Sequence, residues 1–427
     1  MRMKRVYLKT ILCISILFSL ISCIKKDSNL PPYKPENCEP IINSEESSVS
    51  YATIVAVGDI MVHRWQMQRA LNIKDSTYDF SHSFKYVKSI LEDADFAVGN
   101  LETTFAGKNH GRNNDIYGYS CFPYFNAPEA MADELKNAGF DLFSTANNHS
   151  LDSKLSGLYT TLDILDSVGL YHVGTYRNKE ESDSLCIISI NDIKVGFIGC
   201  TQSLNGNRLK KSDNFSVDEF VKQDSAKIAI LCEKIRKMKR KKADVVIAIV
   251  HFGSEYQLTP NRRQKQIAKA FAEAGADVIL GSHPHVLQNI EKYTIYKEGK
   301  EKNVIVAYSL GNFISSQIQR DSLLKDIGAI LKFRFKKSQK GISIDQLSVL
   351  PTYTYWTRQE IGVVPLIKAY HNRKIYPFLT QRGVLNIKNS KQQTIEILTT
   401  SIEEKYEIDT ISGFLNFELE HPIHLTP

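Results

Sequence analysis

Short apolar runs rich in valine and isoleucine recur along the chain, and polar residues follow each of them. The runs are too short for typical helices, and their composition is typical of strands buried on both faces of a parallel sheet. They are TIVAV (53–57), DFAV (95–98), DLFSTA (141–146), DVVIAIV (244–250) and DVIL (277–280). Open parallel sheets bind ligands just beyond their strand ends, so we expect the polar residues to form a site there.

Segments with helical periodicity separate these runs, and several of them end near a glycine such as Gly139, Gly169 or Gly275. The predicted helices span 83–93, 128–138, 155–168, 223–242 and 261–274. Their alternation with strands predicts an α/β fold with a mostly parallel sheet. Residues 184–200 are typical of a hairpin that turns at Asn191 and Asp192, and 327–336 with 342–349 predict an antiparallel flank.

The N-terminus is typical of a targeting segment rather than a part of the fold. A basic start precedes the largely apolar residues 6–22, and Leu20-Ile21-Ser22-Cys23 resembles the lipobox of bacterial lipoproteins. The resemblance implies cleavage before Cys23 and a lipid on its sulfur; an ordinary signal peptide or a membrane anchor is the alternative. Residues 24–50 contain four prolines and suit an extended tether. We therefore expect a lipid-anchored, extracytoplasmic protein of the cell envelope.

Composition excludes several other classes of protein. The chain is 42% hydrophobic and 24% charged, as in ordinary globular proteins, so it can bury a large core. Its net charge of +7 over 427 residues is weak, and no aromatic residues interleave the basic run 236–242, so nucleic acid is not an expected partner. The cysteines show no CxxC spacing, which argues against a zinc–cysteine site.

Five polar clusters carry the candidate chemistry: GDIMVH (58–63), GNLE (99–102), NNH (147–149), HFG (251–253) and GSHPH (281–285). Each has a structural alternative: Asp59 could cap a helix, Asn100 could form a turn, and His63 or His251 could be a packed histidine. His283 and His285 flank Pro284, which favours an extended backbone with both imidazoles on one side. Such a pair would chelate a divalent ion, unless it is a coincidental surface pair.

Together these motifs carry a resemblance. GDIMVHR, NLET, NNHSLD, HFGSEY, GSHPHV and YSLGNFI resemble the successive motifs of the CapA family, the poly-γ-glutamate capsule synthesis proteins. That family is similar in fold to calcineurin-like metallophosphoesterases. The resemblance implies a two-sheet α/β sandwich with helices outside, formed by residues 51–317 with 318–355 as a strand flank. Residues 356–427 would be a C-terminal extension that packs on the domain or binds a partner.

The resemblance also implies a role for each candidate residue. His149 would protonate a leaving group, Arg64 and Asn312 would contact substrate, and one or two divalent ions (Mn, Fe or Zn) would be bound by Asp59, His63, Asn100, Glu102, Asn148, His251, His283 and His285. Two departures concern the ion count. His63 lies four residues after Asp59, where a metallophosphoesterase has its histidine two residues after, and Asn100 stands where such an enzyme has a bridging aspartate.

Two functions follow from these expectations. In the first, the protein is a metal-dependent hydrolase that acts on a phosphoester or an anionic, amide-linked polymer, with membrane proteins of capsule synthesis as partners. In the second, it is a non-catalytic assembly or anchoring factor that uses the same cleft for binding.

Overall fold

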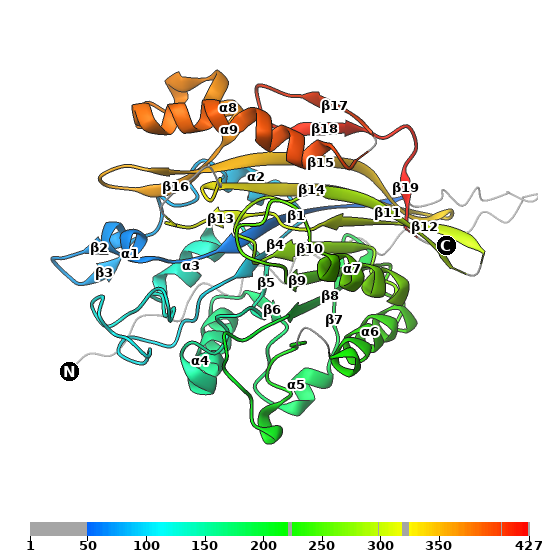
Figure 1. Cartoon of the computed structure of the whole chain (residues 1–427), viewed down its shortest axis with the longest axis horizontal. Coiled ribbons are helices and arrows are strands. Elements are labelled where there is room, and N and C mark those ends of the chain that lie inside the picture. The colour runs from blue at the N-terminus through cyan, green and yellow to red at the C-terminus, as the bar shows by residue number, and fades with distance from the viewer. Residues whose placement is uncertain (1–48, 221–223, 298, 318–323, 403, 426–427) are drawn as a thin grey trace, which may run out of the picture. The chain divides into compact units, whose positions relative to one another are not determined.

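Two β-sheets face each other in the computed structural model, which describes residues 49–220, 224–297, 299–317, 324–402 and 404–425 (Figure 1). The leader, Cys23 and most of the tether lie outside the described residues. In order, the first sheet consists of β17 (Lys405–Ile408), β18 (Leu415–Glu418), β15 (Gly341–Trp356), β14 (Ile327–Ser338), β1 (Ser50–Ile60), β4 (Phe96–Leu101), β5 (Leu142–Ser144) and β6 (Tyr171–Val173). β13 (Asn312–Ile314) pairs with β1, and β16 (Ile361–Pro365) and β19 (Ile423–His424) pair with β15.

The second sheet has the order β11 (Ile290–Lys297), β12 (Lys300–Ala307), β10 (Val278–Ser282), β9 (Val245–His251), β8 (Ile193–Thr201) and β7 (Cys186–Ile190). Its central strands β8, β9, β10 and β12 are parallel, as are β1, β4, β5 and β6 in the first sheet. Antiparallel strands flank both parallel groups. The predicted hairpin is confirmed, because β7 and β8 pair around Asn191 and Asp192, both at positive φ.

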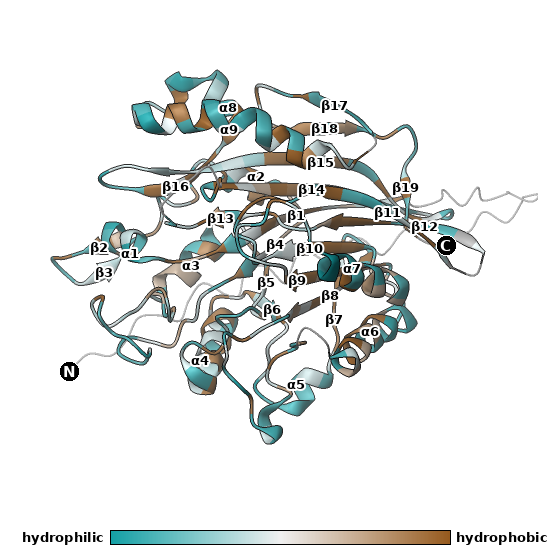
Figure 2. Ribbon diagram, viewed as in Figure 1, coloured by the Kyte–Doolittle hydropathy of each residue, from teal (hydrophilic) through white to brown (hydrophobic). Residues whose placement is uncertain are grey.

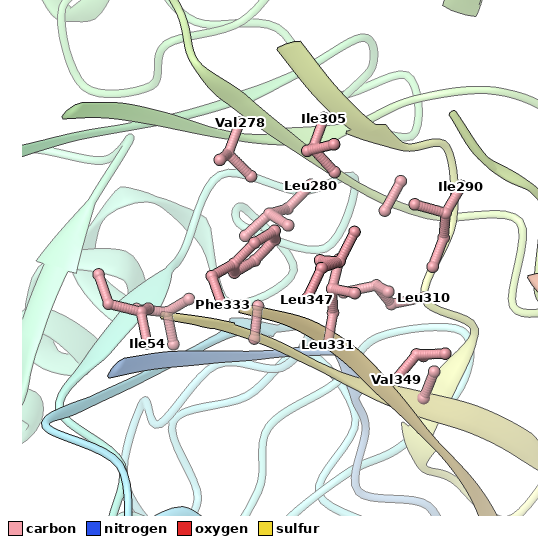
Figure 3. Packing of buried hydrophobic residues seen from close by; sticks show 14 of the residues in the cluster. Ile54, Val278, Leu280, Ile290, Ile305, Leu310, Leu331, Phe333, Leu347 and Val349 are labelled. Carbon is pink, nitrogen blue, oxygen red and sulfur yellow. The ribbon is translucent and has the colours of Figure 1, made fainter. Parts of the chain in front are cut away.

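Apolar side chains fill the space between the sheets (Figure 3). Ile54 from β1 and Leu331 and Phe333 from β14 lie opposite Val278 and Leu280 from β10, and all five are buried. Alternate residues of the same strands, such as Val55 and Val57, point to the other face. This double burial explains why the runs are continuously apolar rather than alternating. In Figure 2 much of β14 and β18 is correspondingly brown, whereas helices such as α6 and α9 show both teal and brown.

Helices cover the outer faces of both sheets. Apolar residues of α6 (Ser225–Arg240) and α7 (Arg262–Ala274) pack on the second sheet, and those of α1 (Arg64–Ala70), α2 (Lys88–Glu92) and α3 (Ala130–Asn137) pack on the first. The remaining described α-helices are α4 (Lys154–Ser167), α5 (Lys179–Asp183), α8 (Leu366–His371) and α9 (Gln381–Thr399), and there are 3-10 turns at Lys211–Asp213 and Arg373–Ile375. A small hairpin pairs β2 (Leu71–Asn72) with β3 (Thr77–Tyr78). The fold is the expected two-sheet α/β sandwich flanked by helices. Among the described residues, no helix has the length and apolar character needed to cross a bilayer.

The C-terminal region is built into the same sandwich. Ile387, Ile395 and Leu398 of α9 belong to the buried cluster that also contains Ile54. β18 and β19 extend the first sheet through pairing with β15. The helix in this region begins at Gln381, because the side chain of Thr380 caps it by accepting from the Gly383 amide.

Candidate metal centre

The polar clusters meet at the carboxyl ends of strands from both sheets, not at the edge of one sheet as the sequence suggested. Asp59 lies one residue before the end of β1, Asn100 lies near the end of β4 with Glu102 just beyond it, His251 ends β9, and His283 and His285 follow β10. All six are buried. The two sheets therefore each supply part of one site.

A backbone irregularity directs Asp59 into this site. The register between β1 and its neighbours shifts at Asp59, as in a β-bulge, which re-aims a side chain. Gly58 makes this possible, because a Cβ there would lie 2.0 Å from the Gly311 carbonyl oxygen. The Asp59 amide then donates to that same carbonyl at 2.9 Å. A larger residue at position 58 would push β1 away from the Gly311 backbone.

The Asp59 carboxylate is surrounded by hydrogen-bond donors. It accepts from Asn100 Nδ2 at 2.8 Å and from the His283 backbone amide at 3.3 Å. His285 Nδ1 lies 3.1 Å from its second oxygen. Asp59 thus connects a side chain of the first sheet to the histidine segment of the second.

Glu102 differs sharply from Asp59 in its surroundings. Both of its carboxylate oxygens are buried without a hydrogen-bond partner among the described residues. The nearest cationic candidates are imidazoles: Nε2 of His251 at 3.6 Å, of His285 at 3.7 Å and of His149 at 3.9 Å from Oε1. Burial, and then the neighbouring Asp59 charge, raise the pKa of Glu102 well above its ordinary value. A buried carboxylate with no partner is expensive, so this position suits a cation from outside the chain.

Three overlapping groups of side chains could hold such a cation. They are Glu102 with His251 and His283, Asp59 with Glu102 and His285, and Glu255 with His283 and His285. Within each group the possible ligand atoms all lie within 4.8 Å of one another. Mixed carboxylate and imidazole ligands fit a divalent transition metal. The orphaned Glu102 oxygens and the buried, unpartnered Oδ1 of Asn100 support the same conclusion.

His251 joins the two halves of the centre. Its Nε2 lies 2.8 Å from Asn148 Oδ1, and its Nδ1 lies 3.2 Å from Asn100 Nδ2 and 3.0 Å from Ser282 Oγ. Burial, followed by the charges of the neighbouring histidines, lowers the pKa of His251 well below its ordinary value. The ring is therefore neutral, which is the form in which histidine binds metal.

The backbone of the GSHPH cluster is not extended, so that prediction was wrong. His283 and His285 have φ values of 95° and 57°, in the left-handed region that costs a non-glycine residue about 1–3 kcal/mol. The bond from the His283 amide to Asp59 helps to hold this turn. The turn places the two ring centroids 6.0 Å apart. The two imidazoles thus converge through a turn instead of along a strand.

His149 lies beside the metal-ligand groups and is held by its own partner. Its Nδ1 is 2.6 Å from Asp152 Oδ2, which also accepts from the Phe125 amide at 2.7 Å. Because a carboxylate only accepts hydrogen bonds, Nδ1 carries the proton and Nε2 faces the side of Glu102. The ring of Phe125 packs edge-on against His149 at 4.6 Å between centroids.

The other predicted residues take different places. His63 belongs to none of the possible ligand groups: its Nδ1 accepts from the Ser316 amide at 3.3 Å and its ring packs edge-on against Phe125. Arg64 points to the surface, where it pairs with Asp115 at 2.6 Å. Asn312 does reach the centre, since its Oδ1 lies 3.1 Å from His285 Nδ1.

Two residues near the centre were missing from the sequence-based candidates. Glu255 offers a carboxylate to His283 and His285, and Asp152 orients His149. Both were within reach of sequence reasoning. Glu255 follows His251 by four residues in HFGSEY, and Asp152 lies three residues after His149, the spacing of neighbours on a helical turn.

Comparisons with known proteins identify the family of this chain. The sequence profile of the family described as "Bacterial capsule synthesis protein PGA_cap" matches residues 53–317. The capsule biosynthesis protein CapA of Bacillus anthracis is 27% identical over 87% of this chain and 83% of its own. The PGA biosynthesis protein CapA of Bacillus subtilis (strain 168) is 29% identical over 67% of this chain and 68% of its own.

Similarity to solved structures is weak. The crystal structure of a hypothetical protein from Thermus thermophilus aligns with a TM-score of 0.36 and 12% identity over 73% of this chain and 97% of that chain. No statement about function follows from a match at this level. The family match, by contrast, covers more than half of the chain and includes every strand end that contributes to the centre. The chain belongs to the CapA family of bacterial capsule synthesis proteins.

Proposed function

We propose that this chain is a metal-dependent hydrolase of capsule synthesis that acts on a phosphoester or an amide-linked polymer. The observation that carries the proposal is Glu102, whose two buried oxygens lack partners among the described residues and which has three imidazoles within 3.9 Å of Oε1. A purely structural carboxylate at this depth would be paired. Membership of the CapA family supports the role in capsule synthesis.

The residues divide into those that bind and those that transfer protons. Asp59, Glu102, His251, His283 and His285 would hold the ion, with Asn100, Asn148 and Glu255 at its margin. A bound divalent ion supplies Lewis-acid polarisation and lowers the pKa of a water ligand. Asp59 fixes the relative position of the two sheets at the site through Asn100 and the His283 amide.

His149 is suited to protonate the departing oxygen or nitrogen. Asp152 holds the imidazole through Nδ1, which leaves Nε2 directed at the centre. The arrangement resembles other acid–base pairs in which a carboxylate orients a histidine and stabilises its charged form. A cleft that only binds a polymer has no need of such a pair, which favours hydrolysis over an assembly role.

The setting is also part of the proposal. A lipid on Cys23 would tether the domain to a membrane outside the cytoplasm, where a surface polymer and the membrane proteins that synthesise it are accessible. The tether composition of residues 24–50 supports this arrangement. Labelling cells with a radioactive fatty acid would test it, since Cys23→Ser should abolish incorporation.

The central experiment measures metal content and hydrolysis together. Full-length protein purified in detergent is analysed for bound metal and assayed on phosphodiester and γ-glutamyl amide substrates, with and without chelator. We expect a stoichiometric divalent metal and an activity that chelation abolishes. His149→Ala should keep the metal and lose about 10²- to 10⁴-fold in rate.

Asp345→Asn is a matched control, because Asp345 pairs with Arg334 on the β14–β15 hairpin, in a different part of the fold. It should leave both metal content and rate unchanged. Wild-type protein that binds metal but cleaves neither substrate, and that behaves like His149→Ala in cells, would instead favour the assembly factor. Absence of metal from the wild-type protein would contradict the metal centre itself.

A further inference from the structure

We propose that a cavity beside the metal centre, formed by the C-terminal helix α9 against strand β15 and the loop residues Gln317 and Asp326, is a subsite for one carboxylate-bearing, amide-linked unit of the polymer. This inference rests on the proposed function. The cavity lies between the end of the family match and the C-terminal region, so neither part forms it alone. Its main polar and aromatic walls are Gln317, Asp326, Tyr353, Trp356, Arg382 and Asn386.

The cavity is connected to the metal centre through Asn312. The amide oxygen of Asn312 lies 3.1 Å from His285 Nδ1. Its Nδ2 donates to Gln317 Oε1 at 3.3 Å and to the Lys325 carbonyl at 2.8 Å. Gln317 lines the cavity. One asparagine therefore separates a possible metal ligand from the wall of the cavity.

Lys325 and Asp326 are consecutive in the chain, but Lys325 lies toward the metal centre and Asp326 lies in the cavity wall. The Lys325 ammonium lies over the ring of Tyr256 at 4.5 Å, and Tyr256 in turn lies beside His285 at 6.1 Å between ring centroids. The Asp326 side chain lines the cavity instead. A polymer that extends from the centre into the cavity would pass a cation at the start of its path, which favours an anionic chain.

The lining fits a unit that has both a carboxylate and an N–H group. Arg382 offers a guanidinium, which binds carboxylates in a fork geometry, and Asn386 and Gln317 offer amide donors. Asp326 is 7% exposed and offers an acceptor for an N–H group. Burial raises the pKa of Asp326 to about 6, so at neutral pH the carboxyl is mostly ionised and can accept from an N–H group. Trp356 and Tyr353 supply apolar walls for the carbon chain.

The size of the cavity matches a single unit. Its volume of about 190 Å³ is somewhat larger than the roughly 150 Å³ of an engineered protein cavity that binds benzene, so it can hold one small unit. Gly383, in the first turn of α9, forms part of the wall. A Cβ at this position would meet nothing closer than 3.4 Å, where it approaches Thr380 Oγ1 and the Tyr353 hydroxyl. A side chain at position 383 would therefore fill the cavity without displacing the helix.

Trp356 offers a direct readout of occupancy. The chain contains two tryptophans, and Trp65→Phe leaves Trp356, in the cavity wall, as the single fluorophore. The experiment titrates this full-length protein with γ-linked triglutamate, in parallel with the same peptide whose free α-carboxylates and terminal γ-carboxylate are amidated. Each titration is repeated with chelator present. We expect saturable fluorescence change with the anionic peptide, at least tenfold weaker binding of the amidated one, and binding that persists in chelator.

Two variants test the cavity by different means. Arg382→Gln removes the guanidinium and should weaken triglutamate binding about tenfold or more, the effect of losing a hydrogen bond to a charged group. Gly383→Leu should abolish the fluorescence change by filling the space. Lys388→Gln is the matched control, because Lys388 is an exposed cation on the same helix that does not line the cavity, and it should bind as the wild type does.

The outcomes separate this inference from the proposed function. Equal binding of the anionic and amidated peptides, or wild-type affinity in both Arg382→Gln and Gly383→Leu, would overturn the subsite even if metal-dependent cleavage of a small substrate is intact. Conversely, a protein that holds no metal and cleaves nothing, yet binds triglutamate in an Arg382-dependent manner, would support the subsite and contradict the hydrolase.

Discussion

Two buried carboxylates, one near each end of strand β10, have opposite surroundings: Asp277 contacts lysines, whereas Glu102 contacts none among the residues that the structure describes. At the start of the strand, Asp277 is fully buried and meets Lys239 at 2.6 Å, Lys302 at 2.9 Å and the Val246 amide at 2.7 Å. Beyond its far end, Glu102 is equally buried, but among the described residues no lysine or arginine pairs with it or with Asp59. The protein neutralises one acid with its own cations and leaves the other to histidines.

This contrast distinguishes a structural acid from a ligand-binding one. Asp277 ties the start of β10 to α6 and β12 through ion pairs that need no ligand. Glu102 gains little from its neighbours in the folded protein, and burial raises its pKa. Burying Glu102 without a partner costs folding free energy, and a bound cation offsets that cost. Metal binding should therefore raise the free energy of unfolding.

The largest expected difference is in the effect of neutralising each acid. Asp277→Asn leaves the buried Lys302 and the partly buried Lys239 without their carboxylate and should lower the free energy of unfolding by about 3–5 kcal/mol. Glu102→Gln in chelated protein should leave it unchanged or raise it, because an unpaired buried charge is removed. Chemical denaturation of both variants in the same buffer measures the difference. Equal destabilisation by the two substitutions would show that Glu102 is a structural acid after all.

Asp326 provides an intermediate case, with Arg382 and Asn386 nearby but a pKa still raised by burial from 3.8 to about 6. The charged form is thus disfavoured in the folded state, by about 3 kcal/mol above the folded pKa. The stability contribution of this group is present below about pH 3.8 and is lost as pH rises through about 6. Asp326→Asn should therefore raise the free energy of unfolding by up to about 3 kcal/mol at about pH 7.5.

The same substitution should have little effect at about pH 4, where the carboxyl is mostly protonated in the folded protein. Urea denaturation at the two pH values gives the comparison. A gain of the same size at both would mean that packing, and not charge burial, explains the effect.

Metal should stabilise the protein only by binding at the centre that contains Glu102. A divalent ion at about 100 times its Kd should raise the free energy of unfolding by about 2.7 kcal/mol, provided that the ion does not bind the unfolded chain. In Glu102→Gln the gain should be largely lost. Asp345→Asn, which changes a carboxylate elsewhere, should keep it, and thermal denaturation with graded metal concentrations reports all three proteins. A metal effect of full size in Glu102→Gln would move the binding site away from this centre.

Sequence reasoning predicted the strands of this fold well, because residues buried on both faces leave continuous apolar runs. The hairpin at Asn191 and Asp192 was readable for a similar reason, since both residues accept positive φ. The assignment of the clusters to a single sheet edge was not correct, because periodicity does not reveal which strands share a sheet.

Local conformation at the centre was also out of reach. Pro284 predicted an extended backbone, but contacts with Asp59 and the facing sheet hold His283 in a left-handed conformation. The role of the C-terminal region was equally hidden, since α9 forms its cavity with β15, Gln317 and Asp326, which lie far from it in the chain. Such features depend on long-range contacts that no local pattern encodes.

The smallest expected effect concerns His63, which the family resemblance assigned as a ligand and the structure places outside the possible ligand groups. Burial, and then the charge of His285, lower its pKa to about 3, so the ring is neutral at physiological pH and cannot donate a proton as an acid. Its contact with Phe125, which packs on His149, gives it an indirect influence on the rate. His63→Asn should keep full metal content by elemental analysis and lose less than about tenfold in rate, whereas His283→Asn should lose metal. If His63→Asn instead loses metal as His283→Asn does, the centre in the metal-bound protein extends to the first sheet's helix α1, and the division between ligands and supporting residues would have to be redrawn.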